Sequence, residues 1–146
     1  MCTFCKIIRS ELPAERIVET ESAIAFLDAR PLFPGHVLVV PRTHAETLTD
    51  LEAAAIGPFF TLVQRVARAV EAGMKADGTF VAMNNRVSQS VPHLHVHVVP
   101  RKKKDGLRGF FWPRHAYGSA EEMRAVGDAI RACFEETEGP VRSTLG

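Results

Sequence analysis

Short hydrophobic runs, separated by polar or proline- and glycine-containing segments, occupy most of the N-terminal two thirds of the chain. Their lengths and their content of β-branched residues predict strands rather than helices. The five expected strands are residues 16–19, 23–27, 36–40, 79–83 and 92–100. The first two are expected to form a hairpin around residues 20–22. The run Val37-Leu38-Val39-Val40 has no polar alternation, so the third strand is expected at the centre of the sheet, buried on both faces.

Helical periodicity occurs in two longer segments. Thr49-Asp50-Leu51-Glu52 has the spacing of a capping box, and apolar residues recur at helical spacing from there to about residue 72, before Gly73. Ser119 and Glu122 have the same spacing ahead of a final helix, where Cys133 beside the apolar stripe is expected to fill core space. A short apolar segment at residues 2–10 has room for one or two helical turns. The pattern predicts an α+β fold, with a five-stranded antiparallel sheet and two main helices.

Composition narrows the functional classes. The chain has 146 residues, 46% of them hydrophobic and 24% charged, which suits one globular domain. Its formal net charge of +1 gives no field that would favour nucleic acid or a membrane surface, so neither is expected as a partner. No apolar run is long enough to span a bilayer, and no signal-peptide pattern opens the chain. The odd count of 3 cysteines argues against a disulfide framework, so a cytoplasmic location is expected.

Three of the 6 histidines stand at alternate positions in the last expected strand. In an extended chain His93, His95 and His97 line one face, whereas Leu94, Val96 and Val98 line the other. Such a ladder suits two chemistries. The imidazoles can bind one metal ion together, or one imidazole can act as a nucleophile while its neighbours orient it and handle charge.

The surrounding residues favour the second chemistry. A hydrolytic metal site usually recruits a nearby carboxylate, and none lies between Asp77 and Asp105. The polar residues before the ladder are instead neutral donors, Asn84, Gln89 and Ser90, which suit phosphate or ribose oxygens. The spacing Cys2-x-x-Cys5 keeps metal binding open elsewhere in the chain.

The run Gln89-Ser90-Val91-Pro92-His93-Leu94-His95-Val96-His97-Val98-Val99 resembles the signature of the histidine triad (HIT) family. Residues 2–8, 25–28 and 34–44 resemble the family's opening, its second strand and its central strand, in the same order and spacing. The similarity covers roughly residues 2 to 101. It implies a single HIT domain over residues 1–146, with a C-terminal extension from about 101 to 146.

The resemblance implies hydrolysis or transfer of a nucleotidyl group that is joined to an amine, a phosphate or another leaving group. His95 would attack the α-phosphorus and form a nucleotidyl-histidine intermediate, and His97 would hydrogen-bond the phosphoryl oxygens or the leaving group. Gln89 and Ser90 would hold the phosphate, while Asp28 would accept from the ribose hydroxyls. The other implied nucleotide contacts are Asn84 in the loop and Phe4, Ile7 and Phe26 around a purine base.

The resemblance also implies a structural zinc ion. Members that carry an N-terminal Cys-x-x-Cys join its thiolates to two histidines, which by position are Cys2, Cys5, His44 and His93 in this chain. Two cysteines and two histidines form a good tetrahedral zinc set. The zinc would leave His95 and His97 free for chemistry, and His36 matches a structural position. Family members commonly pair, so a homodimer is expected.

Two differences from the family pattern leave the identity of the leaving group undecided. The loop at residues 84–90 is shorter than in the purine nucleotide phosphoramidase branch, and the tail after Pro100 is longer, more like the dinucleoside polyphosphate hydrolase branch. An aromatic cluster at residues 110–117 either covers the core or contacts a ligand or subunit. Two other functions compete with the nucleotidyl-histidine mechanism: a metal-dependent hydrolase with the ladder as ligands, and a non-catalytic nucleotide-binding module.

Overall fold

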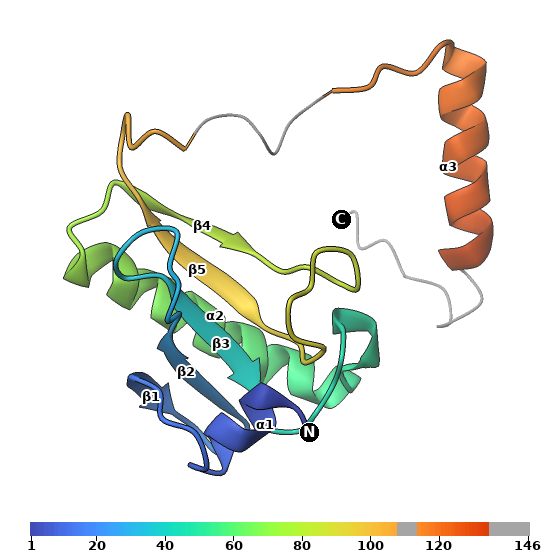
Figure 1. Cartoon of the computed structure of the whole chain (residues 1–146). Helices are drawn as coiled ribbons and strands as arrows, with labels where there is room; N and C mark the ends of the chain where they lie inside the picture. The colour runs from blue at the N-terminus through green and yellow to red at the C-terminus, as the bar shows by residue number, and fades with distance from the viewer. Residues whose placement is uncertain (108–113, 135–146) are drawn as a thin grey trace, which may run out of the picture. The chain divides into compact units, whose positions relative to one another are not determined.

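The computed structural model describes residues 1–107 and 114–134, which fall in two compact units. The first unit, Met1–Asp105, holds the sheet, and the second, Gly106–Gly146, holds one described helix (Figure 1). The aromatic cluster expected at residues 110–117 falls mostly outside the described residues. Of its aromatic side chains only Tyr117 is described, and it is exposed.

A five-stranded antiparallel sheet forms the first unit, which confirms the expected fold class. Its strands are β1 (Arg16–Glu19), β2 (Ala23–Leu27), β3 (Val37–Pro41), β4 (Gly78–Ala82) and β5 (Val96–Arg101). Their order is β1-β2-β3-β5-β4, and every residue of β3 is buried, as expected for an inner strand. The register pairs Leu38 of β3 with His97 of β5, so the histidine segment runs along the middle of the sheet.

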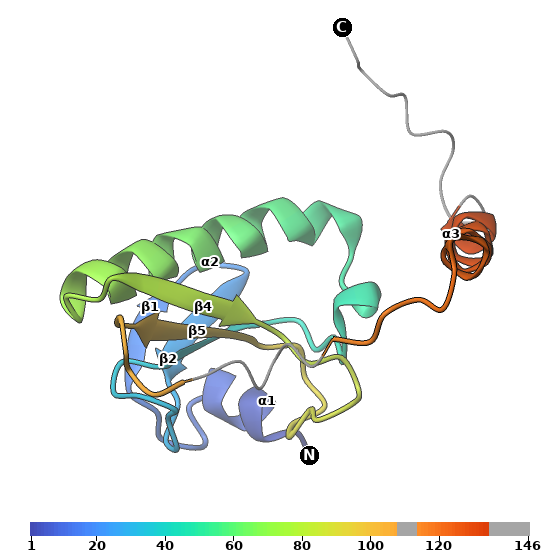
Figure 2. The same ribbon diagram turned by 90° about the horizontal axis from the view of Figure 1, so that it is seen from above.

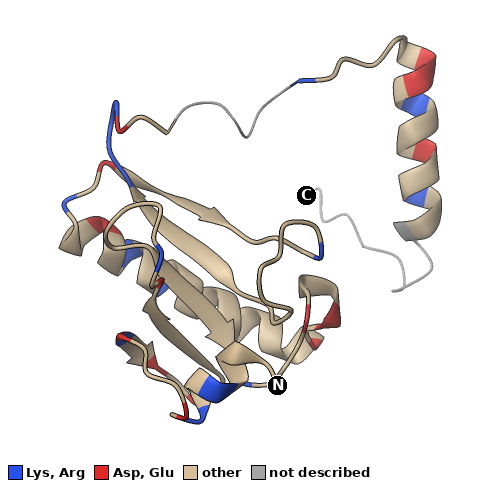
Figure 3. Cartoon of the chain, in the orientation of Figure 1, with Lys and Arg blue, Asp and Glu red and all other residues tan. Residues whose placement is uncertain are grey.

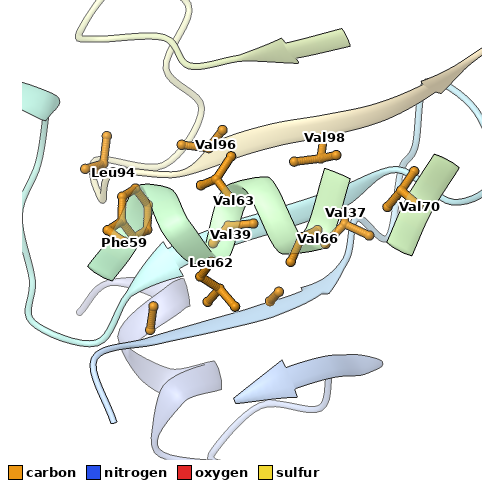
Figure 4. Packing of buried hydrophobic residues seen from close by; sticks show 12 residues of the cluster. Val37, Val39, Phe59, Leu62, Val63, Val66, Val70, Leu94, Val96 and Val98 are labelled. Atoms are coloured by element: carbon orange, nitrogen blue, oxygen red, sulfur yellow. The ribbon is translucent and has the colours of Figure 1, made fainter. Parts of the chain in front are cut away.

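Helices cover both faces of this sheet (Figure 2). The long helix α2 (Ala53–Gly73) packs on one face, and the short helix α1 (Thr3–Ile8) packs on the other. Because side chains alternate along a strand, Val37 and Val39 contact the α2 core, whereas Leu38 and Val40 belong to the α1 cluster. Valines of β3 and β5 meet the buried stripe of α2 in Figure 4. The α1 face therefore holds less apolar packing and leaves room for a site.

Leu62 lies on the buried stripe of α2 and is 3% exposed. Leu62→Ala is expected to lower the free energy of unfolding by about 2–5 kcal/mol, because the substitution removes buried methyl groups and leaves a cavity. Gln64→Ala, on the exposed side of the same helix, is expected to change it by less than about 0.5 kcal/mol. Urea unfolding of both variants measures the difference, and equal losses would contradict the packing of α2.

The capping of α2 differs from the expectation. The prediction of a capping box at Thr49 and Glu52 is wrong. Glu52 is the residue before the helix, and its side chain makes no capping hydrogen bond. The box is formed by Thr47 and Asp50, whose carboxylate accepts from the backbone N–H and the hydroxyl of Thr47. It caps a separate 3₁₀ turn, η1 (Leu48–Asp50), and the extended backbone at Leu51 ends that turn before α2 starts. At the other end Gly73 is still helical, and Lys75 takes the left-handed φ of 51°.

The second unit contains α3 (Ala120–Phe134). Ser119 caps it as expected, because its hydroxyl accepts from the Glu122 N–H, but the Glu122 carboxylate accepts from Gly118 instead of closing a capping box. The expectation that Cys133 fills core space is wrong. Its side chain is exposed within the second unit, as are Met123, Val126 and Ile130 of the stripe beside it.

No helix within residues 1–107 and 114–134 combines the length and the apolar character needed to cross a lipid bilayer.

Candidate active site and metal centre

The histidine segment alternates between the two faces of the sheet, as expected, but less of it is strand. β5 begins only at Val96, because the backbone N–H groups of His93 and Leu94 donate to Val91 and Ala45 outside the sheet. Leu94 still belongs to the α2 core. On the other face the ring of Phe4 packs edge-on against His93 and His95, and the rings of His95 and His97 lie 5.0 Å apart. The alternation therefore places all three imidazoles on the α1 side.

His95 is held in one orientation by its own backbone. Its Nδ1 lies 2.7 Å from the carbonyl oxygen of His93. A carbonyl oxygen only accepts, so Nδ1 carries the proton and the lone pair of the neutral ring lies on Nε2. No buried side-chain nitrogen in the described part of the chain lacks a partner, and Nε2 has none, so this atom is accessible. His95 thus presents an unprotonated nitrogen, which is the nucleophilic form of imidazole.

A cavity of about 500 Å³ opens in front of His95 and His97. Seven of the expected site residues line it: Phe4, Ile7, Phe26, Asp28, Ser90, His95 and His97. The sequence interpretation missed Leu38, the segment 13–15 and Arg30, which line it as well. Strand alternation could have identified Leu38, because it points away from the face that Val37 and Val39 share. The cavity is lined by apolar side chains together with a few polar and charged groups, as is typical of sites for small ligands.

Asp28 follows β2 and serves both as a turn residue and as a site residue. Its Oδ1 accepts from the Arg30 N–H, which stabilises the turn, and its carboxylate also lines the cavity. Its Oδ2 lies 3.7 Å from Nε2 of His36. The other charged residues that line the cavity are Glu15 and Arg30. β3 has none, and the basic run 101–104 lies at the end of β5 away from the histidines (Figure 3).

His36 is the site residue that the sequence interpretation set aside as structural. It lies two residues before Leu38, which pairs with His97, so the two histidines share a face diagonally across β3 and β5. Its Nε2 lies 2.9 Å from Nδ1 of His97, and its Nδ1 accepts from the Leu32 N–H at 3.1 Å. Burial lowers the pKa of His36. Burial, followed by the neighbouring His95 and His36, lowers the pKa of His97 to about 4.

The structure does not bring Asn84 and Gln89 to the cavity wall. The Gln89 amide is bound at both ends, since its oxygen accepts from the Arg86 N–H and its nitrogen donates to the Glu46 carbonyl. Asn84 donates to the Ser88 carbonyl. These bonds hold a loop in which Arg86 and Ser88 take left-handed φ values of 68° and 59°. Both amides thus shape the loop that leads to Ser90, which does line the cavity.

Cys2, Cys5, His44 and His93 form a second cluster, with one ligand atom from each within 4.8 Å of the others. Nδ1 of His93 lies 3.4 Å from Sγ of Cys2 and 3.6 Å from Sγ of Cys5, and the Cys5–His44 separation is 3.4 Å. Tetrahedral zinc with bonds of about 2.3 Å to sulfur and about 2.0 Å to nitrogen places such atoms about 3.5 Å apart. The four residues therefore fit a zinc ion.

The partner of His93 strengthens this fit. Its Nε2 lies 2.8 Å from the Pro41 carbonyl oxygen, so Nε2 carries the proton and Nδ1 keeps its lone pair toward the thiols. Without a metal, burial and then the neighbouring Cys2 thiol raise the pKa of Cys5. The ladder does not form one ligand set among the described residues, because His93 groups with the cysteines and His97 with Asp28 and His36. A single metal held by all three ladder histidines is thus disfavoured.

Comparison with known proteins gives consistent matches. The model of the HIT domain matches residues 9–104. An adenosine 5'-monophosphoramidase of Schizosaccharomyces pombe is 32% identical over 130 residues, which span 88% of this chain and 95% of that protein. The crystal structure of a HIT family member from Bacillus subtilis superposes with a TM-score of 0.82 at 34% identity, covering 90% of this chain and 95% of that one. A Zn-bound histidine triad family protein from Mycobacterium smegmatis has a TM-score of 0.69 at 36% identity, covering 92% and 96%.

Proposed function

The chain belongs to the HIT domain family, and on this premise we propose that it cleaves the α-phosphate bond of nucleoside phosphoramidates or dinucleoside polyphosphates through a nucleotidyl-His95 intermediate. The observation that carries the proposal is the free Nε2 of His95 at the cavity, with Nδ1–H anchored on the His93 carbonyl. The S. pombe relative, named an adenosine 5'-monophosphoramidase, supports the first of these two substrate classes.

The cavity suggests how a nucleotide would bind. A purine base would pack against the apolar lining formed by Phe4, Ile7 and Phe26, with Leu38 as a further wall. The ribose would then lie at Asp28, whose carboxylate can accept from two hydroxyl groups. The α-phosphate would then lie beside His95, His97 and Ser90, which line the same cavity.

The reaction would proceed in two displacements. Nε2 of His95 attacks the α-phosphorus, and the bond from phosphorus to the leaving nitrogen or oxygen breaks with its electron pair on the departing group. The imidazole bonded to phosphorus carries a positive charge, which the Nδ1–H bond to the His93 carbonyl stabilises. Water then attacks the phosphorus and gives up a proton to the solvent, and the P–N bond breaks to restore the lone pair on Nε2. The product is a nucleoside monophosphate.

The zinc ion that the cysteine–histidine cluster fits is proposed as a structural one. Cys2 is the N-cap of α1 and Cys5 lies within that helix, whereas His44 and His93 belong to segments that follow β3 and precede β5. A bound zinc ion would join these three segments and hold Phe4 against His95. His95 and His97 remain free of this ligand set for the phosphoryl reaction.

A substrate screen tests the proposed function. Purified full-length protein is offered adenosine phosphoramidate, diadenosine polyphosphates and a nucleotidyl sulfate, and release of AMP is followed. We expect turnover of at least one of the first two classes. Tight AMP binding with no turnover of any of them would instead support a non-catalytic nucleotide-binding module.

Asp28→Asn tests the ribose contact. The substitution keeps the acceptor for the Arg30 N–H but removes the charge that strengthens hydrogen bonds from ribose hydroxyls. We expect wild type to prefer a ribose over a 2',3'-dideoxyribose substrate by about tenfold in kcat/KM, since one charge-assisted hydrogen bond contributes about 1.5 kcal/mol. Asp28→Asn should lose most of this preference.

Glu15→Gln is the matched control, because Glu15 is a second carboxylate that lines the same cavity. It should keep the preference for ribose. A preference that survives in Asp28→Asn would place the ribose elsewhere.

A further inference from the structure

Cys2 and Cys5 are close enough to form a bond with each other. Cys2 is the N-cap of α1, and the Cys5 N–H donates to its Sγ at 3.5 Å. The two Sγ atoms lie within 4.8 Å of each other. Helix geometry separates the Cα atoms of residues three apart by about 5 Å, which falls within the range of about 4.4–6.8 Å that disulfides span. Rotation of the two side chains is therefore sufficient to join the sulfurs.

The pair is open to solvent on one side. Both side chains are partly exposed, and His44, whose Nδ1 lies 3.4 Å from Sγ of Cys5, is exposed. Sγ of Cys2 lies instead 3.4 Å from Nδ1 of His93, which is buried. A small oxidant in solution therefore reaches Cys5 most directly, from the side of His44, and Cys2 is the second thiol within reach.

Phe4 stands between the two cysteines and links them to the nucleotide cavity. Its ring packs edge-on against Phe26 and His95, with centroid separations of 5.6 Å and 5.1 Å, and it lines the cavity. The helix that carries it, α1, has 6 residues, and only Phe4 and Ile7 among them are buried. Because α1 has so little apolar packing of its own, the cysteine–histidine cluster is what holds Phe4 firmly against His95.

We propose that Cys2 and Cys5 form a site of reversible oxidation, at which a peroxide joins them in a disulfide, removes both thiolate ligands from the zinc site and displaces Phe4 from the wall of the nucleotide cavity. A disulfide would leave His44 and His93 as the remaining members of the ligand set, too few for a tetrahedral site. The effect on nucleotide binding rests on the proposed function, whereas the disulfide does not.

Hydrogen peroxide serves as the two-electron acceptor of this reaction. Both sulfurs start as thiolates, the form in which zinc sites bind cysteine. The Cys5 sulfur attacks one peroxide oxygen, the O–O bond breaks, hydroxide leaves, and Cys5 becomes a sulfenic acid. The Cys2 thiolate then attacks the Cys5 sulfur, so that the S–S bond forms and the S–O bond breaks with release of a second hydroxide. A small thiol reverses the oxidation by exchange.

Mass spectrometry and zinc release test the disulfide. The full-length protein with Cys133→Ser, which retains only the pair, is loaded with zinc and treated with hydrogen peroxide. Trypsin cleaves after Lys6, so both cysteines fall in one peptide, residues 1–6. This peptide should lose two hydrogen atoms at its cysteines, and the bound zinc should pass to a chromogenic chelator. Dithiothreitol should restore the thiols and zinc binding.

Single substitutions test the order of the two steps. Cys2→Ser removes the second thiol, so Cys5 should accumulate as a sulfenic acid that dimedone labels. Cys5→Ser is the matched control, and its Cys2 should be labelled about fivefold less, because Cys2 lies against the buried His93. Stronger labelling of Cys2 than of Cys5 would overturn this order.

AMP affinity tests the link between the pair and the cavity. The oxidised protein should bind AMP about tenfold more weakly than the reduced protein, because one aromatic wall of the site is displaced. Its kcat should change by less than about threefold, since His95 lies outside the cysteine–histidine cluster. Reduced Phe4→Ala should show a similar loss of affinity and lose little more on oxidation. Equal AMP affinity before and after oxidation of wild type would overturn the link.

The remaining outcomes separate this inference from the proposed function. Sulfinic acids at both cysteines, or intact thiols with the zinc retained, overturn the oxidation site even if the enzyme turns over nucleotides. A reversible disulfide with release of zinc, in a protein whose reduced form binds no AMP, supports the oxidation site and counts against the proposed function only.

Discussion

His95→Ala is expected to abolish turnover, lowering kcat by a factor of about 10⁴ or more, because the substitution removes the nucleophile and leaves only binding interactions to act on the substrate. The fold should survive. His95 is buried, but its ring borders the open cavity, so its loss creates little closed void. Release of AMP from adenosine phosphoramidate measures the rate, and circular dichroism measures the fold.

The matched control is His115→Ala. His115 is an exposed histidine outside the unit that holds the sheet. Its replacement should leave the rate within experimental error. Wild-type turnover in His95→Ala would remove His95 from the mechanism.

Removal of the proposed zinc ion is expected to have the second large effect, on stability rather than chemistry. A ligand present at about 1,000 times its dissociation constant stabilises the folded state by about 4 kcal/mol. A chelator, or Cys5→Ser, should remove that contribution and lower the melting temperature by more than about 10 °C. The measurement is a thermal melt together with the zinc content. At a temperature where the stripped protein is still folded, kcat should change by less than about threefold, because His95 and His97 lie outside the ligand set.

Cys133→Ser controls for the general effect of removing a thiol. Cys133 is exposed on α3 and lies in none of the metal-binding groups of the described residues. It should retain zinc and melt as wild type does. Complete loss of activity on chelation, with the fold intact, would instead favour a catalytic metal.

The pattern of apolar residues in the expected strands was enough to predict much of the fold and part of the site. Two-residue alternation was enough to separate the imidazole face from the Leu94–Val98 face, and the apolar run at residues 37–40 located an inner strand. The helix start could not be found in the same way. Thr47 and Thr49 both stand three residues before an acidic residue, and only the backbone turn at Leu51 decides which pair forms the capping box.

The contact between His36 and His97 could not be predicted from the sequence, for a different reason. It depends on the pairing of Leu38 with His97, and nothing in either strand by itself determines the register between β3 and β5. The same holds for Gln89. Its amide suits a phosphate, but the structure places the Glu46 carbonyl and the Arg86 N–H within its reach. The residue types indicated the chemistry of the site, whereas the hydrogen-bond partners of these side chains are determined by the tertiary structure.

The central claim is that His95 becomes covalently bonded to the nucleotide. Wild-type protein mixed with adenosine phosphoramidate and quenched within one turnover in alkaline denaturant, which preserves phosphohistidine, can be digested and analysed by mass spectrometry. The account predicts one adenylyl group on the peptide that contains His95, on the His95 ring. Steady turnover with no adduct on any residue, or an adduct on another residue, would contradict it.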